Sequence, residues 1–425
     1  MLVGIKIAVL GAASTYTPEL VQGIASHRDR LPVDELMLMD INPERLETVG
    51  GLAGRILKKR EWPGRLTLSV SREQAVEEAT FVLIQLRVGG QQARLLDETL
   101  PLEFGCIGQE TTGPGGFAKA LRTVPIVLDI AEDVARHSAP GAWIIDFTNP
   151  VGIVTQALLD EGHRAIGLCN SAMGFERMIG RLLNLAPEAV SLEHVGLNHL
   201  TWERAATVDG QDRLPGLLEA HGDEIAAEIG IPAELVRVLK AVPSYYLRYY
   251  YCTDEVLAEQ LSGRHRSRAE EVMEIEGRLL AMYRDPALQD KPALLGQRGG
   301  AYYSEAAARL IASLLAGTGD VQAVDVRNAG GLPDLPQDAV VEVPARIDQE
   351  GAHPLALAPL APEMAGLTQQ VKAYERLTVE AAIHGDRAAA LKALMANPLV
   401  PSYRTAKGLL TALLEANRQH LPRFF

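Results

Sequence analysis

The sequence predicts an α/β protein with a doubly wound parallel sheet in residues 1–195, followed by a mainly helical α+β part in residues 196–425. Two observations favour the first part: short apolar runs alternate with longer segments of helical spacing, and turn residues bound each run. A third observation favours the second part, because amphipathic helical spacing predominates from about residue 193. We therefore place a domain boundary near residue 195.

Five short apolar runs are the expected strands of the N-terminal sheet. The first crossover helix is the best marked, because Thr17 can cap it and Pro18 suits its first turn. Its apolar stripe is Leu20, Val21, Ile24 and Ala25. The expected strands are 6–11, 35–40, 81–86, 142–147 and 165–169; later helices are expected over 267–283, 303–315 and 363–384, with a strand over 340–347.

Composition excludes several classes of protein. The 425 residues carry a net charge of −13 without a basic run, which disfavours a nucleic-acid partner. The longest apolar runs fall far short of the roughly 20 residues of a membrane span. Lys6 interrupts the first apolar run, which argues against a signal peptide. Three cysteines are typical of a reducing compartment, so we expect a cytoplasmic protein.

The first strand leads into the turn Gly11-Ala12-Ala13-Ser14-Thr15, where only Gly11 fits the dinucleotide-binding fingerprint. Context favours a Rossmann-like reading nonetheless, because a helix N-terminus follows the turn and Asp40 ends the next strand. That carboxylate can accept hydrogen bonds from an adenosine ribose. A βαβ unit without a nucleotide stays open as the alternative.

Cys169 and Asn170 follow an apolar run, so both are expected at the carboxyl end of a parallel strand, where α/β proteins bind ligands. Together with His199, the Cys169 thiolate could hold Mn²⁺, Fe²⁺, Co²⁺ or Ni²⁺. Two ligands are too few for a structural zinc site, so such a metal would be exchangeable and shared with substrate. A buried cysteine and a structural histidine remain the plain alternatives.

Three further segments carry groups that could contact a ligand. The loop 108–116 is dense in glycine and contains Glu110, and Asn149 closely follows the run 142–147. Residues 244–251 hold five tyrosines, most of which we expect to pack, while one could act as a base. A mobile turn is the alternative for the glycine loop.

Seven ordered motifs together resemble glycoside hydrolase family 4, and within it the branch that acts on 6-phospho-β-glucosides. The resemblance extends to Tyr374-Glu375-Arg376-Leu377-Thr378 and so covers nearly the whole chain. The motifs are Tyr16-Thr17-Pro18-Glu19-Leu20, Arg87-Val88-Gly89-Gly90, Gly108-Gln109-Glu110-Thr111-Thr112-Gly113, Phe147-Thr148-Asn149-Pro150, Leu168-Cys169-Asn170, Gly196-Leu197-Asn198-His199-Leu200 and Tyr246-Leu247-Arg248-Tyr249-Tyr250.

The resemblance implies a hydrolase that keeps NAD⁺ and a divalent metal such as Mn²⁺ as cofactors. By analogy, C3 of the sugar is oxidised, C2 loses a proton, the group at C1 is eliminated, water adds and C3 is reduced again. The resemblance also implies that the second half is like the C-terminal half of lactate and malate dehydrogenases. Family members are usually homodimers or homotetramers, and the expected partner is a phosphorylated disaccharide or aryl glycoside.

Site residues follow from the matched motifs. Cys169 and His199 are implied to hold the metal, and Tyr246 is implied to be the base at C2. The implied cofactor contacts are Gly11, Ala13, Ser14, Thr15, Asp40 and Asn149, and the implied substrate contacts are Arg87, Arg94, Glu110, Asn149, Asn170 and Arg268.

The anomeric preference depends on Asn170, because α-acting branches of the family tend to carry Asp there; we expect a β-glycosidase. Two departures concern the first turn, which has few glycines, and Ser171-Ala172, where relatives often have Val-Pro. Open alternatives keep the mechanism but use an unphosphorylated, galacto-configured or α-linked glycoside. A plain NAD-dependent 2-hydroxy-acid dehydrogenase and a non-enzymatic NAD-binding protein also remain open.

Overall fold

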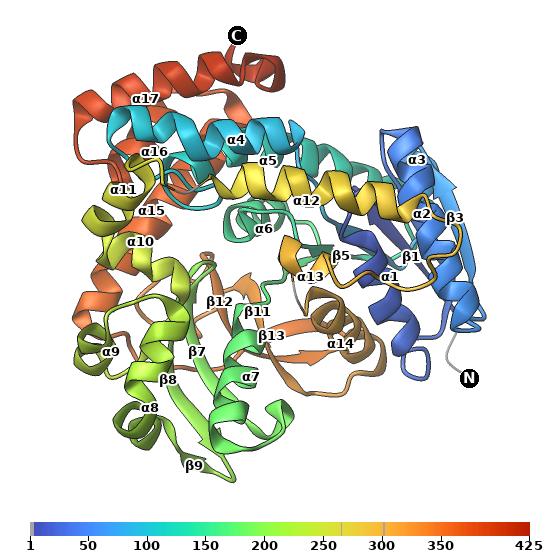
Figure 1. The fold of residues 1–425 in the computed structure, drawn as a ribbon, viewed down its shortest axis with the longest axis horizontal. Coiled ribbons are helices and arrows are strands. Elements are labelled where there is room, and N and C mark those ends of the chain that lie inside the picture. The colour runs from blue at the N-terminus through green and yellow to red at the C-terminus, as the bar shows by residue number, and fades with distance from the viewer. Residues whose placement is uncertain (1–3, 265, 301) are drawn as a thin grey trace.

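A single mixed sheet runs through the whole molecule. The computed structural model describes residues 4–264, 266–300 and 302–425. The strand order is β10-β8-β7-β12-β11-β6-β5-β4-β1-β2-β3, with β13 paired to β12 and β9 paired to β8. Helices flank the sheet: α1 packs against α2 and α14, and α5 packs against α6 and α15 (Figure 1).

The N-terminal half of the sheet is parallel, as the sequence predicts. Its order, 3-2-1-4-5-6, is that of dinucleotide-binding domains. The sequence prediction missed β3, a partly exposed edge strand in which polar residues alternate with leucines. The strands are β1 (Ile5–Leu10), β2 (Val33–Met39), β3 (Arg65–Ser69), β4 (Phe81–Ile84), β5 (Trp143–Asp146) and β6 (Ala165–Gly167).

Antiparallel strands from the second half of the chain continue the same sheet. Asp325 of β11 pairs with Gly167 of β6, which joins the two halves. Only β12 was predicted, as 340–347. The division at residue 195 stays a prediction, and that position lies within β7. The strands are β7 (Ser191–Leu197), β8 (Leu200–Val208), β9 (Gln211–Asp212), β10 (Val242–Pro243), β11 (Val321–Arg327), β12 (Val340–Asp348) and β13 (Gly351–Pro354).

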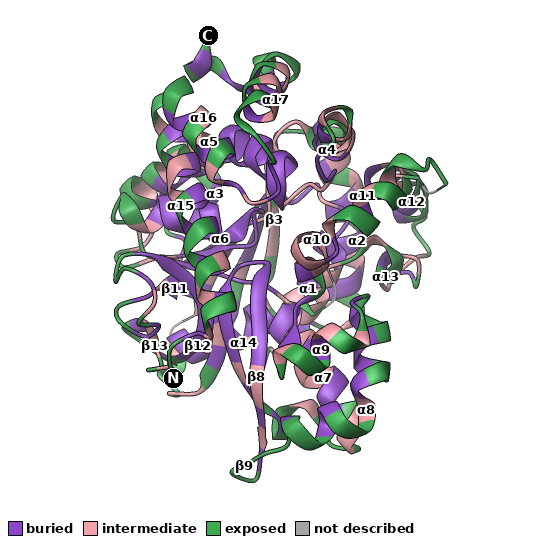
Figure 2. Ribbon diagram, turned by 90° about the vertical axis from the view of Figure 1, so that its left-hand side faces the viewer, coloured by how far each residue is buried: buried purple, intermediate pink, exposed green. Residues whose placement is uncertain are grey.

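Helices make up most of the remainder. Their outer faces are exposed, while the central strands of the sheet are largely buried (Figure 2). The helices predicted over 267–283, 303–315 and 363–384 are confirmed within one residue at each end as α12, α14 and α15. The α-helices are α1 (Thr17–Ser26), α2 (Pro43–Lys59), α3 (Arg72–Val76), α4 (Gly90–Thr99), α5 (Gly113–His137), α6 (Val151–Asp160), α7 (Ser171–Leu183), α8 (Leu214–Ile229), α9 (Ala233–Leu239), α10 (Arg248–Tyr251), α11 (Thr253–Leu261), α12 (Arg268–Tyr283), α13 (Leu295–Arg298), α14 (Tyr303–Ala316), α15 (Pro362–His384), α16 (Arg387–Ala396) and α17 (Tyr403–Ala416).

The start of α1 corrects one prediction. Thr17 is the first helical residue, not the cap, and its hydroxyl accepts a hydrogen bond from Gln85 Nε2 at 2.8 Å. Tyr16 occupies the cap position without a side-chain capping bond. The predicted apolar stripe is buried, and α1 packs against α2 and α14. Thr17 thus ties the helix start to the segment that follows β4.

Apolar packing is continuous from the N-terminal strands to the C-terminal helices. Among the described residues, no helix combines the length and the apolar character that crossing a bilayer requires.

Candidate active site

The turn after β1 begins at a glycine that no other residue could replace without strain. Gly11 has a φ of +84°, and a Cβ there would lie 2.7 Å from the backbone oxygen of Gln85. The backbone N–H of Ala13 donates to Asp40 Oδ2 at 3.0 Å, so the carboxylate after β2 lies against the turn. Ser14 and Thr15 lead directly into α1, whose N-terminus suits a pyrophosphate. These residues fit the predicted cofactor site.

A cation that the sequence analysis missed lies at the same turn. Arg298, the last residue of α13, reaches Ser14 Oγ at 3.3 Å and Glu276 Oε1 at 3.2 Å. Glu276 also accepts from Thr15 Oγ1 and from Arg45 Nη2, each at 3.1 Å. Arg298 follows no recognisable motif, and only the fold brings it to a turn 284 residues earlier. A partly buried guanidinium at this place suits phosphate oxygens.

Asn149 lies at the carboxyl end of β5, as predicted. Its Oδ1 is buried and has no hydrogen-bond partner among the described residues. A buried acceptor of this kind requires a donor. A cofactor amide or a sugar hydroxyl would supply one, so the residue fits both of its predicted roles.

Cys169 lies two residues after the end of β6 and is buried. Burial raises the pKa of its thiol well above the usual range, and the nearby carboxylates of Glu342 and Asp325 raise it further. The hydroxyl of Tyr303 is hydrogen-bonded to it. A thiol in these surroundings ionises when a cation lies beside it, which is the behaviour of a metal ligand.

His199 lies in the two-residue turn between β7 and β8. Its Nδ1 is 3.0 Å from Thr111 Oγ1, which leaves Nε2 as the ring nitrogen for a metal. Burial, with the charge of Lys119, lowers the pKa of His199 to about 3. The ring is therefore neutral, as a metal ligand must be.

Tyr246 lies close to both candidate metal ligands. Its ring stacks on His199, and burial raises the pKa of its phenol well above 10, to which the neighbouring Tyr245 and Cys169 contribute. The structure therefore brings Cys169, His199 and Tyr246 together from three segments. Among the described residues, no group of three or more His, Cys, Asp or Glu side chains is placed to hold a metal. The two-ligand site that the sequence predicts fits this arrangement.

The predicted cations Arg87 and Arg94 converge on Glu110. Arg94 Nη2 lies 3.2 Å from Glu110 Oε1, and Arg87 forms an ion pair with Oε2. The sequence analysis missed Lys119, which also binds Oε2 at 2.7 Å. Burial opposes ionisation of Glu110, but these three cations outweigh it and hold its pKa well below the ordinary value. Burial lowers the pKa of Lys119 to about 8.

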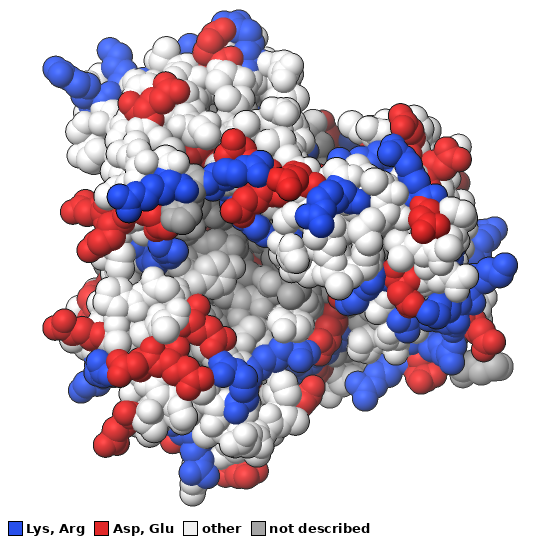
Figure 3. All heavy atoms as spheres, in the orientation of Figure 1, with Lys and Arg blue, Asp and Glu red and all other residues white. Residues whose placement is uncertain are grey.

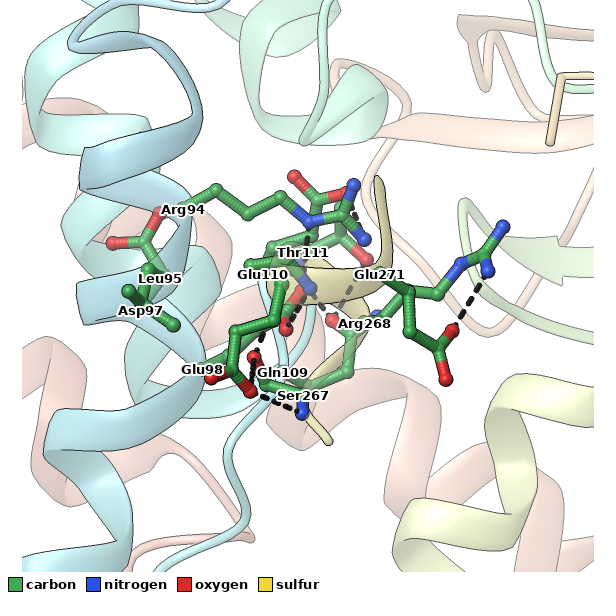
Figure 4. A network of polar contacts seen from close by, with 12 residues as sticks. Arg94, Leu95, Asp97, Glu98, Gln109, Glu110, Thr111, Ser267, Arg268 and Glu271 are labelled. Atoms are coloured by element: carbon green, nitrogen blue, oxygen red, sulfur yellow. Dashed lines mark hydrogen bonds and ion pairs between the residues drawn. The ribbon is translucent and has the colours of Figure 1, made fainter. Parts of the chain in front are cut away.

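Arg268 lies at the start of α12, beside Arg94. Glu98 links them, because its carboxylate contacts Arg94 Nε and the backbone N–H of Ala269, both at 2.7 Å (Figure 4). The Arg268 guanidinium lies 2.9 Å from Glu271 Oε2 and donates to the carbonyl of Gln297. It is exposed, whereas Arg94 is buried.

Asn170 follows Cys169 and stands at the N-terminus of α7, on the same edge of the sheet. The space-filling view, in the orientation of Figure 1, shows a hollow in the molecular surface. Mostly uncharged atoms form its floor, and charged side chains lie along its rim (Figure 3).

The fold and the site define an enzyme of the Rossmann type, with a cofactor turn beside a thiol, an imidazole and a phenol. The chain belongs to glycosyl hydrolase family 4. The model of "Family 4 glycosyl hydrolase" matches residues 6–185, and that of its C-terminal domain matches residues 194–400. This confirms the resemblance found in the sequence and the class of enzyme, and it disfavours a plain dehydrogenase or a non-enzymatic protein.

Three known proteins illustrate the similarity. A probable 6-phospho-β-glucosidase of Bacillus subtilis is 41% identical, over 99% of this chain and 98% of its own. The 6-phospho-β-glucosidase of Thermotoga maritima has been solved with NAD and glucose-6-phosphate, at 37% identity and a TM-score of 0.92 over 98% and 99% of the two chains, and also with manganese. Malate dehydrogenase of Plasmodium falciparum, 15% identical with a TM-score of 0.53 over 89% and 98%, shares the fold alone.

Proposed function

We propose that this chain hydrolyses 6-phospho-β-glucosides to glucose 6-phosphate and the free aglycone, with NAD⁺ and a divalent ion, Mn²⁺ first, as cofactors. One observation carries the proposal: Cys169, His199 and Tyr246 meet at the carboxyl edge of the parallel strands that also form the dinucleotide turn. The similarity to 6-phospho-β-glucosidases over nearly the whole chain supports the substrate class.

Cys169 Sγ and His199 Nε2 are the proposed metal ligands, with further positions left for substrate oxygens. The turn 11–15, Asp40 and Asn149 are the proposed cofactor contacts. When bound, NAD⁺ supplies reversible removal of hydride from C3, and the metal supplies Lewis acidity toward the oxygens on C2 and C3.

Tyr246 is the proposed base. A ketone at C3 makes the proton on C2 acidic, so a phenolate facing C2 can remove it while the leaving group departs from C1. Water then adds to C1, and Tyr246 returns a proton to C2. Burial disfavours the phenolate, and a cation held by Cys169 and His199 acts in the opposite direction. The tyrosine and the metal ligands therefore depend on one another.

Substrate recognition is assigned to the cations and amides around this centre. Arg94, Arg87 and Arg268 are the proposed phosphate contacts, because guanidinium groups suit phosphate oxygens. Glu110, Asn149 and Asn170 are proposed to bind sugar hydroxyls. Asn170 after the metal cysteine favours the β-anomer.

Hydrolysis of p-nitrophenyl β-D-glucoside 6-phosphate tests the proposal, with its unphosphorylated twin and the α-linked compound alongside. The enzyme is stripped with EDTA, and Mn²⁺ and NAD⁺ are returned singly and together. We expect release of p-nitrophenol from the 6-phospho-β compound only when both are present. Activity without NAD⁺, or preference for either companion substrate, would contradict it.

Two variants locate the metal site in the same experiment. Cys169→Ser should weaken Mn²⁺ binding and leave NAD⁺ binding intact, because the thiolate is lost but the dinucleotide turn is not. Cys252→Ser is the control, since Cys252 packs with Ile107 and Val256 in a separate apolar cluster and is not a proposed ligand. Equal Mn²⁺ affinity in wild type and Cys169→Ser would remove Cys169 from the metal site.

We also propose that the chain forms a homodimer or homotetramer and acts in the cytoplasm. Light scattering of the purified protein tests the first statement, and a mass of one chain would contradict it.

A further inference from the structure

A buried array of four polar side chains underlies the turn that carries His199. His194 Nδ1 lies 2.6 Å from Glu203 Oε1, and its Nε2 lies 2.8 Å from Glu342 Oε1. The second oxygen of Glu342 accepts from Asn198 Nδ2 at 2.8 Å. The four residues come from β7, β8, β12 and the β7–β8 turn, and all are buried.

The turn itself is strained. His199 has a φ of +62°, in the left-handed region that costs a residue with a Cβ about 1 kcal/mol or more. Gly196, three residues earlier, has a φ of +145°, and a Cβ there would lie 2.1 Å from the carbonyl oxygen of Leu200. Such a conformation persists only when surrounding contacts hold it. One such contact is the hydrogen bond from Asn198 to Glu342. Glu342 lies on β12 opposite Gly196, so this bond ties the turn to the neighbouring strand.

The array also carries charge. Burial disfavours the imidazolium of His194, but Glu203 and Glu342 outweigh it and raise the pKa of His194 well above its ordinary value. Glu342 is close enough to Cys169 to disfavour its thiolate, and it is the first carboxylate among the causes of that shift. Negative charge that opposes an isolated thiolate favours a divalent cation at the same place.

At Asp325, the other carboxylate near Cys169, burial together with Glu342 and Glu375 raises the pKa well above its ordinary value, which disfavours the charged form. Both oxygens of Glu342 accept hydrogen bonds, whereas neither oxygen of Asp325 has a partner among the described residues.

We propose that Glu342 is a positioning residue of the metal site: through Asn198 it holds the turn that presents His199, and its buried charge favours a divalent cation beside Cys169. The inference rests on the proposed function, because it takes Cys169 and His199 as the ligands. Outer contacts of this kind commonly change metal affinity about 10- to 100-fold.

The test compares Mn²⁺ dissociation constants of full-length variants, measured by electron paramagnetic resonance of free Mn²⁺. Glu342→Gln keeps the shape and removes the charge, and Asn198→Ala removes the anchor of the turn. Glu203→Gln is the matched control. Glu203 is as buried as Glu342 and binds the same histidine. Unlike Glu342, it does not bind Asn198 and is not among the groups that chiefly shift the pKa of Cys169. NAD⁺ binding, followed by fluorescence, reports whether each variant is folded.

We expect Glu342→Gln and Asn198→Ala each to raise the Mn²⁺ dissociation constant about 10-fold or more. Glu203→Gln should stay close to wild type, and NAD⁺ affinity should not change in any variant. Excess Mn²⁺ should restore the activity of Glu342→Gln, which a folding defect would not allow. If Glu342→Gln does not fold, Asn198→Ala decides the question.

Wild-type Mn²⁺ affinity in Glu342→Gln or in Asn198→Ala would overturn the inference, as would an equal loss in Glu203→Gln. A wild-type enzyme that binds no Mn²⁺, or a Cys169→Ser variant that binds it normally, would instead overturn the proposed metal site.

Discussion

The ring of Tyr246 lies face to face with the imidazole of His199, with centroids 3.6 Å apart and planes 13° apart. Tyr245 packs on the outer side of Tyr246 at 4.3 Å. The ring of the proposed base therefore also fixes the orientation of a proposed metal ligand by stacking on it. These two roles belong to different parts of one side chain, the hydroxyl and the ring.

Tyr246→Phe separates the two roles. The phenyl ring keeps the stack on His199, so Mn²⁺ affinity should be unchanged, while loss of the hydroxyl should lower kcat by about 10²- to 10⁴-fold. Incorporation of solvent deuterium at C2 of the released sugar, followed by NMR, should fall in parallel. Tyr246→Leu, which also loses the stack, should weaken Mn²⁺ binding. Full proton exchange in Tyr246→Phe would show that another group is the base.

A variant at Arg298 should affect cofactor binding without affecting metal binding. The Arg298 guanidinium contacts Ser14 beside the predicted pyrophosphate site, so Arg298→Met should raise the dissociation constant of NAD⁺ about 10- to 100-fold. Mn²⁺ affinity should be unaffected. Arg278→Met, an exposed position on α12, is the charge-matched control and should bind NAD⁺ as wild type does. Calorimetric titration with NAD⁺ measures both, and equal affinities would exclude a role for Arg298.

The difference between Asp40 and Arg298 shows what the sequence could predict. Asp40 follows a strand at a fixed place in a βαβ unit, so local pattern and topology place it at the turn. Arg298 reaches the same turn from a short helix near residue 300, and no local pattern carries that contact. Cys169, His199 and Tyr246 are an intermediate case. Their strand-end or loop positions were readable and the chemistry of Cys169 and His199 suggested a shared metal, but only the family resemblance implied that Tyr246 lies with them.

Local structure was missed for similar reasons. The β7–β8 connection has Asn198-His199 in place of the Asn-Gly type that marks a tight hairpin, so its strands were absent from the prediction. Thr17 has the chemistry of a cap, but a tertiary partner, Gln85, takes its hydroxyl. In both cases a contact distant in sequence outweighs a local preference.

Arg122 and Asp97 form a buried two-pronged ion pair, with N–O distances of 2.9 and 2.7 Å, joined by Asn417. Asp97→Asn leaves the guanidinium without its charge partner and should lower the free energy of unfolding by about 3–5 kcal/mol. Glu415→Gln breaks an exposed pair with Arg418 and should leave the free energy of unfolding nearly unchanged. Urea titration compares the two. A similar, small effect of both variants would show that the buried pair adds little beyond an apolar contact.

Glu176 on α7 should make stability depend on pH. Burial, with a contribution from Glu203, raises its pKa in the folded chain from an ordinary value of 4.5 to about 7. The folded state therefore holds this proton more tightly than the unfolded state. Its contribution is fully present below about pH 4.5 and is lost as the pH rises to about 7, a difference of up to ~3 kcal/mol.

Glu176→Gln mimics the protonated side chain and should remove this dependence. The variant should match wild type near pH 4.5 and exceed it in melting temperature above pH 7, because only wild type then carries a poorly solvated charge. Glu219→Gln, at an exposed position on α8, controls for the change in net charge and should follow wild type at every pH. Melting curves between pH 4.5 and 8 measure the difference. A constant offset between Glu176→Gln and wild type across that range would mean that Glu176 ionises at its ordinary pKa in the folded protein.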